Sequence, residues 1–152
     1  MTEVAFHFNA PDKVAYACRL LRKALGGGSR LVVLGDDDTL GLLDRALWNM
    51  APHEFLAHCR LQPADAAAPT ATPDFVRDAS PLVLAASAEG APHQQVLVNL
   101  GDEVPAGFGR FERLIEVVGR DDAADRQRAR ARWKHYADRG YAITRHDLAL
   151  RS

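Results

Sequence analysis

Short apolar runs and amphipathic segments alternate along the first third of the chain. Residues 4–8 and 30–35 are rich in Val, Leu and Phe, and both runs stop at turn-forming residues, which predicts two strands. Residues 13–25 and 39–50 carry apolar side chains at intervals of three or four, which predicts two helices with one buried face each. A strand–helix–strand–helix order is typical of a parallel sheet with helices packed on it.

Two further apolar runs, at residues 82–85 and 95–100, flank a stretch that includes Gly90 and Pro92. Glycine and proline between two apolar runs favour a tight turn, so we expect these two strands to form an antiparallel hairpin. Residues 62–80 have a different character, because they are rich in Ala, Pro, Asp and Thr and show little hydrophobic periodicity. This composition predicts a flexible surface loop.

The last third of the chain predicts three more elements. Residues 108–114 suit a short helix, and residues 115–118 suit a strand. Residues 121–139 predict a long, Arg-rich helix that ends at Gly140. With the elements above, this pattern predicts an α/β fold: a single three-layer, Rossmann-like domain over residues 1–152, with a mostly parallel sheet and one antiparallel hairpin.

The bulk composition fits one ordinary domain. The chain has 152 residues with 47% hydrophobic and 26% charged side chains, enough for a sizeable core under a polar surface. The formal net charge is only -1, so any electrostatic role depends on an uneven distribution of charge. Cys18 and Cys59 have no paired spacing, so we expect neither a disulfide framework nor a zinc knuckle. Since no signal-like N-terminus and no apolar run of about 20 residues is found, we expect a cytoplasmic protein with no membrane contact.

The loops after the first two strands lack the motifs of nucleotide-binding enzymes. Residues 9–12 contain no glycine that lets the backbone approach a pyrophosphate, and Gly26–Arg30 precedes a strand instead of opening a helix. Asp36–Asp38 could hold a magnesium ion, but helix capping also explains acids at this position. His53, His58 and Cys59 could be ligands or a catalytic pair, but no fourth ligand stands at a recognisable spacing. We therefore expect no catalytic residue, metal or cofactor, and a small nucleotide-binding enzyme remains an alternative.

The long C-terminal helix carries a row of cations. Arg126, Arg130 and Lys134 stand one helical turn apart, at the border of an apolar stripe that contains Trp133. Cations beside an apolar edge suit an acidic peptide with an aromatic anchor, or a free C-terminal carboxylate. A solvated charged face and direct nucleic-acid binding are the alternatives. The other expected stripe members are Ala129, Tyr136 and Ala137, and those expected on the opposite, solvated side are Arg128, Arg132 and Arg139.

A group of large side chains surrounds the end of the second predicted helix. Trp48 stands near the end of this helix and Pro52 breaks it. Phe55 and His58 follow within a few residues. Such a group fits either core packing or an exposed patch that anchors a partner.

Several segments, taken in their order and spacing, resemble one known family. They are Leu43–Trp48, Val96–Leu100, Phe111–Arg113, Glu116–Val118 and, most specific, Ala129–Tyr136. The chain is similar to the chi subunit of bacterial DNA polymerase III over nearly its whole length, apart from residues 62–80. The resemblance implies a non-catalytic accessory subunit of the polymerase holoenzyme, associated with the clamp loader, that supports DNA replication and contacts DNA only indirectly.

The same resemblance implies two partner surfaces. One surface takes the acidic C-terminal tail of single-stranded DNA-binding protein, which ends in phenylalanine. The positions that match it are Arg126, Arg130, Lys134 and Trp133. The other surface takes the psi subunit, which connects to the clamp loader, or a repair helicase in its place. The positions that match this second surface are Trp48, Pro52, Phe55 and His58.

Overall fold

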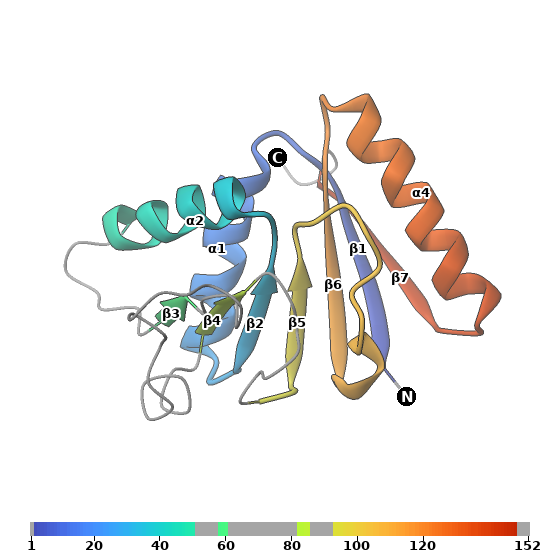
Figure 1. Cartoon of the computed structure of the whole chain (residues 1–152), viewed down its shortest axis with the longest axis horizontal. Helices are drawn as coiled ribbons and strands as arrows, with labels where there is room; N and C mark the ends of the chain where they lie inside the picture. Colours follow the sequence, from blue (N-terminus) through green and yellow to red (C-terminus); the bar gives the residue numbers. More distant parts are fainter. Residues whose placement is uncertain (1, 51–57, 61–81, 86–92, 149–152) are drawn as a thin grey trace, which may run out of the picture.

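The computed structural model describes residues 2–50, 58–60, 82–85 and 93–148 (Figure 1), so the loop predicted at residues 62–80 lies outside the described residues. The strands are β1 (Glu3–Ala10), β2 (Leu31–Leu34), β3 (His58–Arg60), β4 (Leu82–Ala85), β5 (Val96–Asn99), β6 (Arg113–Gly119) and β7 (Ile143–Asp147). The helices in the described part are α1 (Lys13–Gly26), α2 (Asp37–Met50), α4 (Ala123–Asp138) and the short 3-10 helix η1 (Phe108–Arg110).

These strands form one sheet in the order β3-β4-β2-β5-β6-β1-β7, and all strand pairs in the described residues are parallel. The parallel sheet is confirmed, but the predicted antiparallel hairpin is wrong. Leu31 of β2 lies opposite both Leu82 of β4 and Val96 of β5, so β4 and β5 flank β2 and run parallel to it. Turn-forming residues between two apolar runs show where a strand stops, and they do not decide which strand it pairs with.

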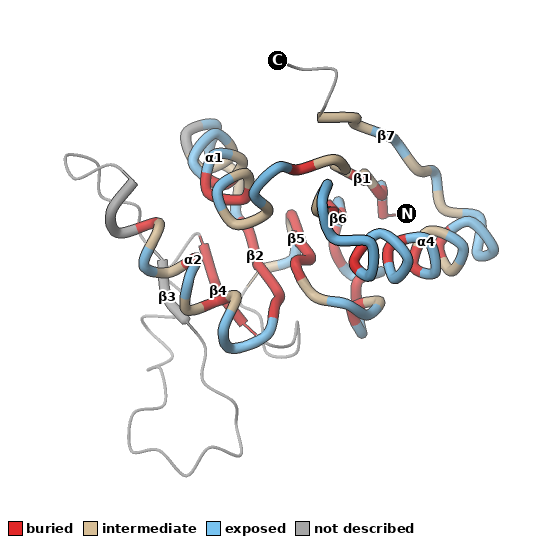
Figure 2. Tube along the Cα trace, turned by 90° about the horizontal axis from the view of Figure 1, so that it is seen from above, coloured by how far each residue is buried: buried red, intermediate tan, exposed pale blue. Residues whose placement is uncertain are grey.

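Alternating side chains along the central strands divide the core into two layers. Leu31 and Val33 of β2 pack with α1 and α2 on one face of the sheet. Val32 and Leu34 face the other way and belong to the cluster that includes Ala129 of α4. Figure 1 shows α4 on the opposite side of the sheet from α1 and α2, and Figure 2 shows its buried side turned to the strands. The predicted three-layer α/β architecture is therefore confirmed.

Acidic side chains set the starts of the helices. Asp12 accepts a hydrogen bond from the backbone N–H of Ala15 at the start of α1, and Asp122 does the same for Asp125 at the start of α4. Asp36 accepts from the backbone N–H of Thr39, and this bond holds the pKa of Asp36 below its usual value. Asp36 thus caps α2, and Asp37 and Asp38 stand in the first turn of this helix, where acids are favourable. Within the described residues, no group of three potential ligands is placed to hold a metal ion.

Two strands of the sheet were not expected from the sequence. They are β3 and β7, which form the two edges. The predicted helix over residues 108–114 is only η1, because β6 already begins at Arg113. In the part of the chain that is described, no helix has the length and apolar character needed to cross a membrane.

Candidate functional site

Helix α4 presents two of its cations to a groove on the surface of the sheet. Arg126, Arg130 and Lys134 are all exposed, and none of them forms an ion pair with a described residue. Arg126 and Arg130 line the groove, whereas Lys134 continues the row beyond it. Two of the three predicted cations thus lie beside the groove and the third does not, and their role in binding a partner stays a prediction.

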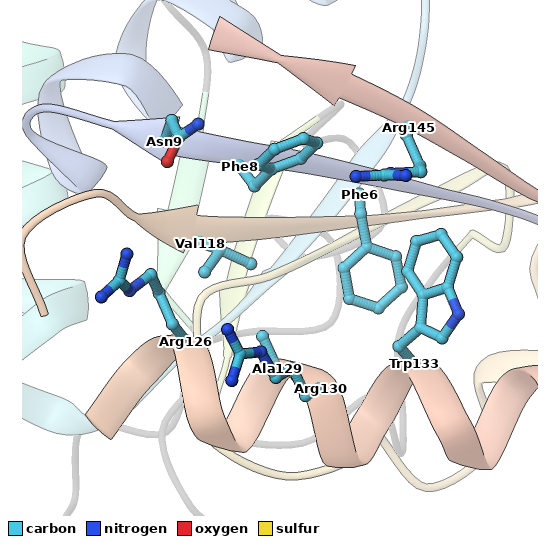
Figure 3. Close-up of a pocket in the computed structure, with 9 residues that line it drawn as sticks. All are labelled: Phe6, Phe8, Asn9, Val118, Arg126, Ala129, Arg130, Trp133 and Arg145. Atoms are coloured by element: carbon cyan, nitrogen blue, oxygen red, sulfur yellow. The ribbon is translucent and has the colours of Figure 1, made fainter. Parts of the chain in front are cut away.

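The groove measures about 560 Å³ and lies between α4 and the edge of the sheet formed by β1 and β7 (Figure 3). It combines an aromatic and aliphatic surface with three guanidinium groups. Its lining residues are Phe6, Phe8 and Asn9 of β1, Val118 of β6, Arg126, Ala129, Arg130 and Trp133 of α4, and Arg145 of β7. None of these residues is acidic, so the groove attracts carboxylates.

Aromatic rings form the apolar end of the groove. Phe6 is buried, and its ring centroid lies 4.9 Å from that of Trp133, in a tilted arrangement that is favourable for aromatic pairs. Trp133 is half-buried, so part of its indole remains accessible from the groove. Val118 and Ala129 continue this apolar surface between the strands and the helix. The surface is suited to an aromatic side chain of a partner.

A local irregularity in β1 places a polar side chain at the other end of the groove. The register between β1 and β6 shifts between His7 and Ala10, and Asn9 adopts φ 64°, a left-handed conformation that asparagine tolerates. The side-chain amide of Asn9 donates a 2.8 Å hydrogen bond to Oδ1 of Asp147 on β7. This bond ties the ends of β1 and β7 together beside the groove.

Arg145 is the charged lining residue that sequence reasoning missed, and the apolar lining residues Phe6, Phe8 and Val118 were not predicted for the site either. Its guanidinium carbon lies 5.4 Å from the ring centroid of Phe8 and 5.9 Å from that of Trp133, within the range of cation–π contacts. The segment around Arg145 is polar and short of apolar residues, so no pattern indicated a strand. The only available signal was its position a few residues after the helix-ending Gly140.

A buried network beneath α4 corrects a second expectation. Arg132, expected on the solvated side, is only 2% exposed, and its Nε donates a 2.6 Å hydrogen bond to Glu116, which is 0% exposed. Ala129, Arg132 and Tyr136 follow the three-and-four spacing of one helix face, which the charge of the arginine obscured. Ala137, expected in the apolar stripe, is exposed.

Several donors converge on the buried carboxylate of Glu116. Tyr136 donates its hydroxyl proton over 2.9 Å and Asn99 donates from its amide over 2.8 Å, in addition to Arg132. The other end of the guanidinium donates to the backbone carbonyl of Asp102 over 2.8 Å. Arg132 and Tyr136 belong to α4 and Glu116 belongs to β6, so these hydrogen bonds hold the helix in one position against the strand.

Burial and charge act in opposite directions on this network. Burial raises the pKa of Glu116, while the guanidinium of Arg132 and the hydrogen bonds from Asn99 and Tyr136 counteract that rise. Burial and the adjacent carboxylate of Glu116 also raise the pKa of Tyr136 far above its ordinary value. Tyr136 therefore keeps its proton and remains a donor at neutral pH.

The aromatic patch predicted as a second surface is only partly described. Trp48 belongs to α2 and His58 to β3, while Pro52 and Phe55 lie outside the described residues. Strand β3 forms one edge of the sheet and β7, beside the groove, forms the other. His58 and the groove thus belong to opposite edges of the sheet, and the patch itself stays a prediction.

Comparison with known proteins agrees with the resemblance seen in the sequence. The family model described as "DNA polymerase III chi subunit, HolC" matches residues 1–144. The chain belongs to the DNA polymerase III chi subunit family. A chi relative, "DNA polymerase III subunit chi" of Pseudomonas aeruginosa, is 29% identical over 153 residues, which cover 97% of this chain and 98% of the relative. Chi subunits are accessory, non-catalytic parts of the DNA polymerase III holoenzyme and support DNA replication.

Proposed function

We propose that this chi-family chain is a replisome adaptor in the cytoplasm, built as one domain. In this role it binds the acidic C-terminal tail of single-stranded DNA-binding protein in the groove beside α4. The observation that carries the proposal is the composition of the groove, in which three arginines surround an aromatic surface and no lining residue is acidic. An acidic peptide with a terminal aromatic ring is complementary to both features.

The charges and the aromatic surface of the groove have separate roles in the proposed complex. Carboxylates of the tail pair with Arg126 and Arg130, and Lys134 extends the attraction beyond the groove. The terminal ring of the tail packs against Phe6 and Trp133. Because the cations are exposed, we expect an affinity on the order of micromolar that weakens as the salt concentration rises.

The second part of the proposal concerns the link to the clamp loader. The patch of Trp48, Pro52, Phe55 and His58 takes a psi subunit, or a repair helicase in its place. The support for this assignment is the match of these positions to the family, together with the location of α2 and β3 away from the groove. Because β3 and β7 form opposite edges of the sheet, the chain can hold two partners at the same time.

The structure weakens the case for the alternatives. Direct nucleic-acid binding requires a dense set of available cations on α4, but Arg132 is buried against Glu116 and Arg128 pairs with Asp102 over 3.1 Å. A nucleotide-binding enzyme would use the acids at positions 36–38, and Asp36 already caps α2. We therefore propose that DNA is contacted only through single-stranded DNA-binding protein.

The proposal is tested with a fluorescently labelled acidic peptide that ends in Pro-Phe. Arg130→Ala is expected to weaken its binding by about 1–3 kcal/mol, because a charge-assisted contact at the groove is lost. The measurement is fluorescence anisotropy at low salt.

Two control variants accompany Arg130→Ala. Arg128→Ala removes the same charge from the same helix outside the groove, and Phe55→Ala alters the other proposed surface. Both are expected to bind the peptide as the wild type does. If Arg130→Ala and Arg128→Ala lost the same affinity for the peptide, the assignment of the groove as the binding site would be contradicted.

A further inference from the structure

Arg145 gives the groove a cationic wall on the side opposite α4. In the sheet register it lies next to Phe6 of β1, so the two side chains share the face of the sheet that α4 covers. Arg126 and Arg130 approach from the helix, whereas Arg145 approaches from the edge strand β7 (Figure 3). A ligand in the groove therefore meets guanidinium groups from both sides.

The guanidinium of Arg145 is held in place without being neutralised. It contacts the rings of Phe8 and Trp133 and forms no ion pair with a described residue. Asp147, two residues further along β7, does not line the groove and accepts a hydrogen bond from Asn9. Contacts through the ring faces leave the N–H groups of an arginine free to donate in the plane of the guanidinium. Arg145 is thus preorganised to receive a carboxylate.

The three arginines differ in their distance from the aromatic end of the groove. Along α4, Arg126 precedes Trp133 by seven residues, or about 10 Å, and Arg130 precedes it by three residues, or about 4.5 Å. Arg145 contacts Trp133 directly. Figure 3 shows Arg145 and Trp133 together at one end of the groove and Arg126 at the other. Of the three arginines, Arg145 is the one with a ring contact to Trp133, so it lies beside an aromatic ring packed on this tryptophan.

The chemistry of a chain end connects this arrangement to a ligand. In a terminal aromatic residue, the ring and the α-carboxylate are attached to the same Cα atom and lie within a few ångströms of each other. Resting on the proposed function, we propose that Arg145 binds the terminal α-carboxylate of the acidic tail and so fixes the direction of the bound peptide. The chain end lies at Arg145, and the acidic side chains that precede it run along Arg130 towards Arg126.

This orientation makes the groove selective for a free chain end. An acidic segment inside a longer chain has no α-carboxylate, so it cannot use Arg145 in the same way. A guanidinium and a carboxylate pair in one plane through two hydrogen bonds, and this geometry favours a free chain end over an internal segment. Arg126, at the far end, contributes attraction to any acidic ligand and no preference for a terminus.

The test uses two acidic peptides that end in Pro-Phe and differ only in a free or an amidated C-terminus. Wild-type protein is expected to bind the free acid about tenfold more tightly than the amide, as expected when one charged pair is lost. Arg145→Gln should lower the affinity for the free acid by a similar factor and abolish the preference for it. Arg126→Gln is the matched control, since it should weaken both peptides equally and preserve the preference.

Each outcome separates this inference from the proposed function. If Arg145→Gln binds more weakly but still prefers the free acid by the wild-type ratio, the α-carboxylate is bound elsewhere and the inference is overturned, while tail binding stands. If wild-type protein binds neither peptide at millimolar concentration, the proposed function fails and the inference falls with it. Circular dichroism of each variant confirms folding, and Arg145 is an exposed residue whose replacement removes no buried contact.

Discussion

Arg132→Ala is expected to lower the free energy of unfolding by about 3–5 kcal/mol, the usual range when one partner of a buried ion pair is removed. The substitution leaves the carboxylate of Glu116 buried and without its counter-charge, and it frees the backbone carbonyl of Asp102. Against a total stability of about 5–15 kcal/mol for a typical domain, this loss is large. Urea unfolding followed by circular dichroism measures it.

Two variants make the result for Arg132→Ala interpretable. Arg128→Ala breaks an exposed ion pair with Asp102 on the same helix and should cost less than about 1 kcal/mol. The double variant Glu116→Gln/Arg132→Met removes both buried charges and should recover part of the lost stability. If Arg132→Ala and Arg128→Ala lowered the free energy of unfolding by similar amounts, the buried network would not be what holds α4.

The double reversal Arg126→Glu/Arg130→Glu is expected to weaken binding of the acidic tail peptide by about 100-fold or more at low salt. Each reversal removes an attractive contact and adds a repulsive one, and a tenfold change corresponds to about 1.4 kcal/mol. Both side chains are exposed and unpaired among the described residues, so the fold should be unaffected. Anisotropy titrations at several salt concentrations measure the loss.

The control for this reversal carries the same change in net charge at positions outside the groove. Arg113→Glu/Arg128→Glu replaces two exposed arginines that do not line it. Loss of long-range attraction alone should weaken peptide binding by this control a few-fold, and this loss of affinity should shrink as the salt concentration rises. If the control bound the peptide as weakly as the groove variant, the attraction would come from net charge alone and not from the groove.

Periodicity predicted most of the architecture, because the helices and central strands bury regular sets of side chains. The runs at β2, β4 and β5 are buried in full and were recognisable as strands. Their pairing was not recognisable, since it depends on contacts between distant segments. Hence the sequence indicated a hairpin where β2 separates β4 from β5.

The same reasoning found one wall of the groove and missed the other. Arg126, Arg130 and Trp133 share a helix, so their relation follows from the geometry of a single element. Arg145 joins them only because β7 adds to the edge of the sheet beside β1, and a short polar edge strand has no apolar pattern. Arg132 was misplaced for a related reason, because its buried partner Glu116 lies on another element.

The two tryptophans of the chain provide the most direct test of where the tail binds. Trp133 lines the groove, and Trp48 belongs to α2 in the other proposed surface. In an NMR titration of ¹⁵N-labelled protein with the acidic peptide, the account predicts that the indole N–H signal of Trp133 shifts to saturation while that of Trp48 stays in place. Movement of the Trp48 signal, with that of Trp133 unchanged at saturating peptide, would contradict it.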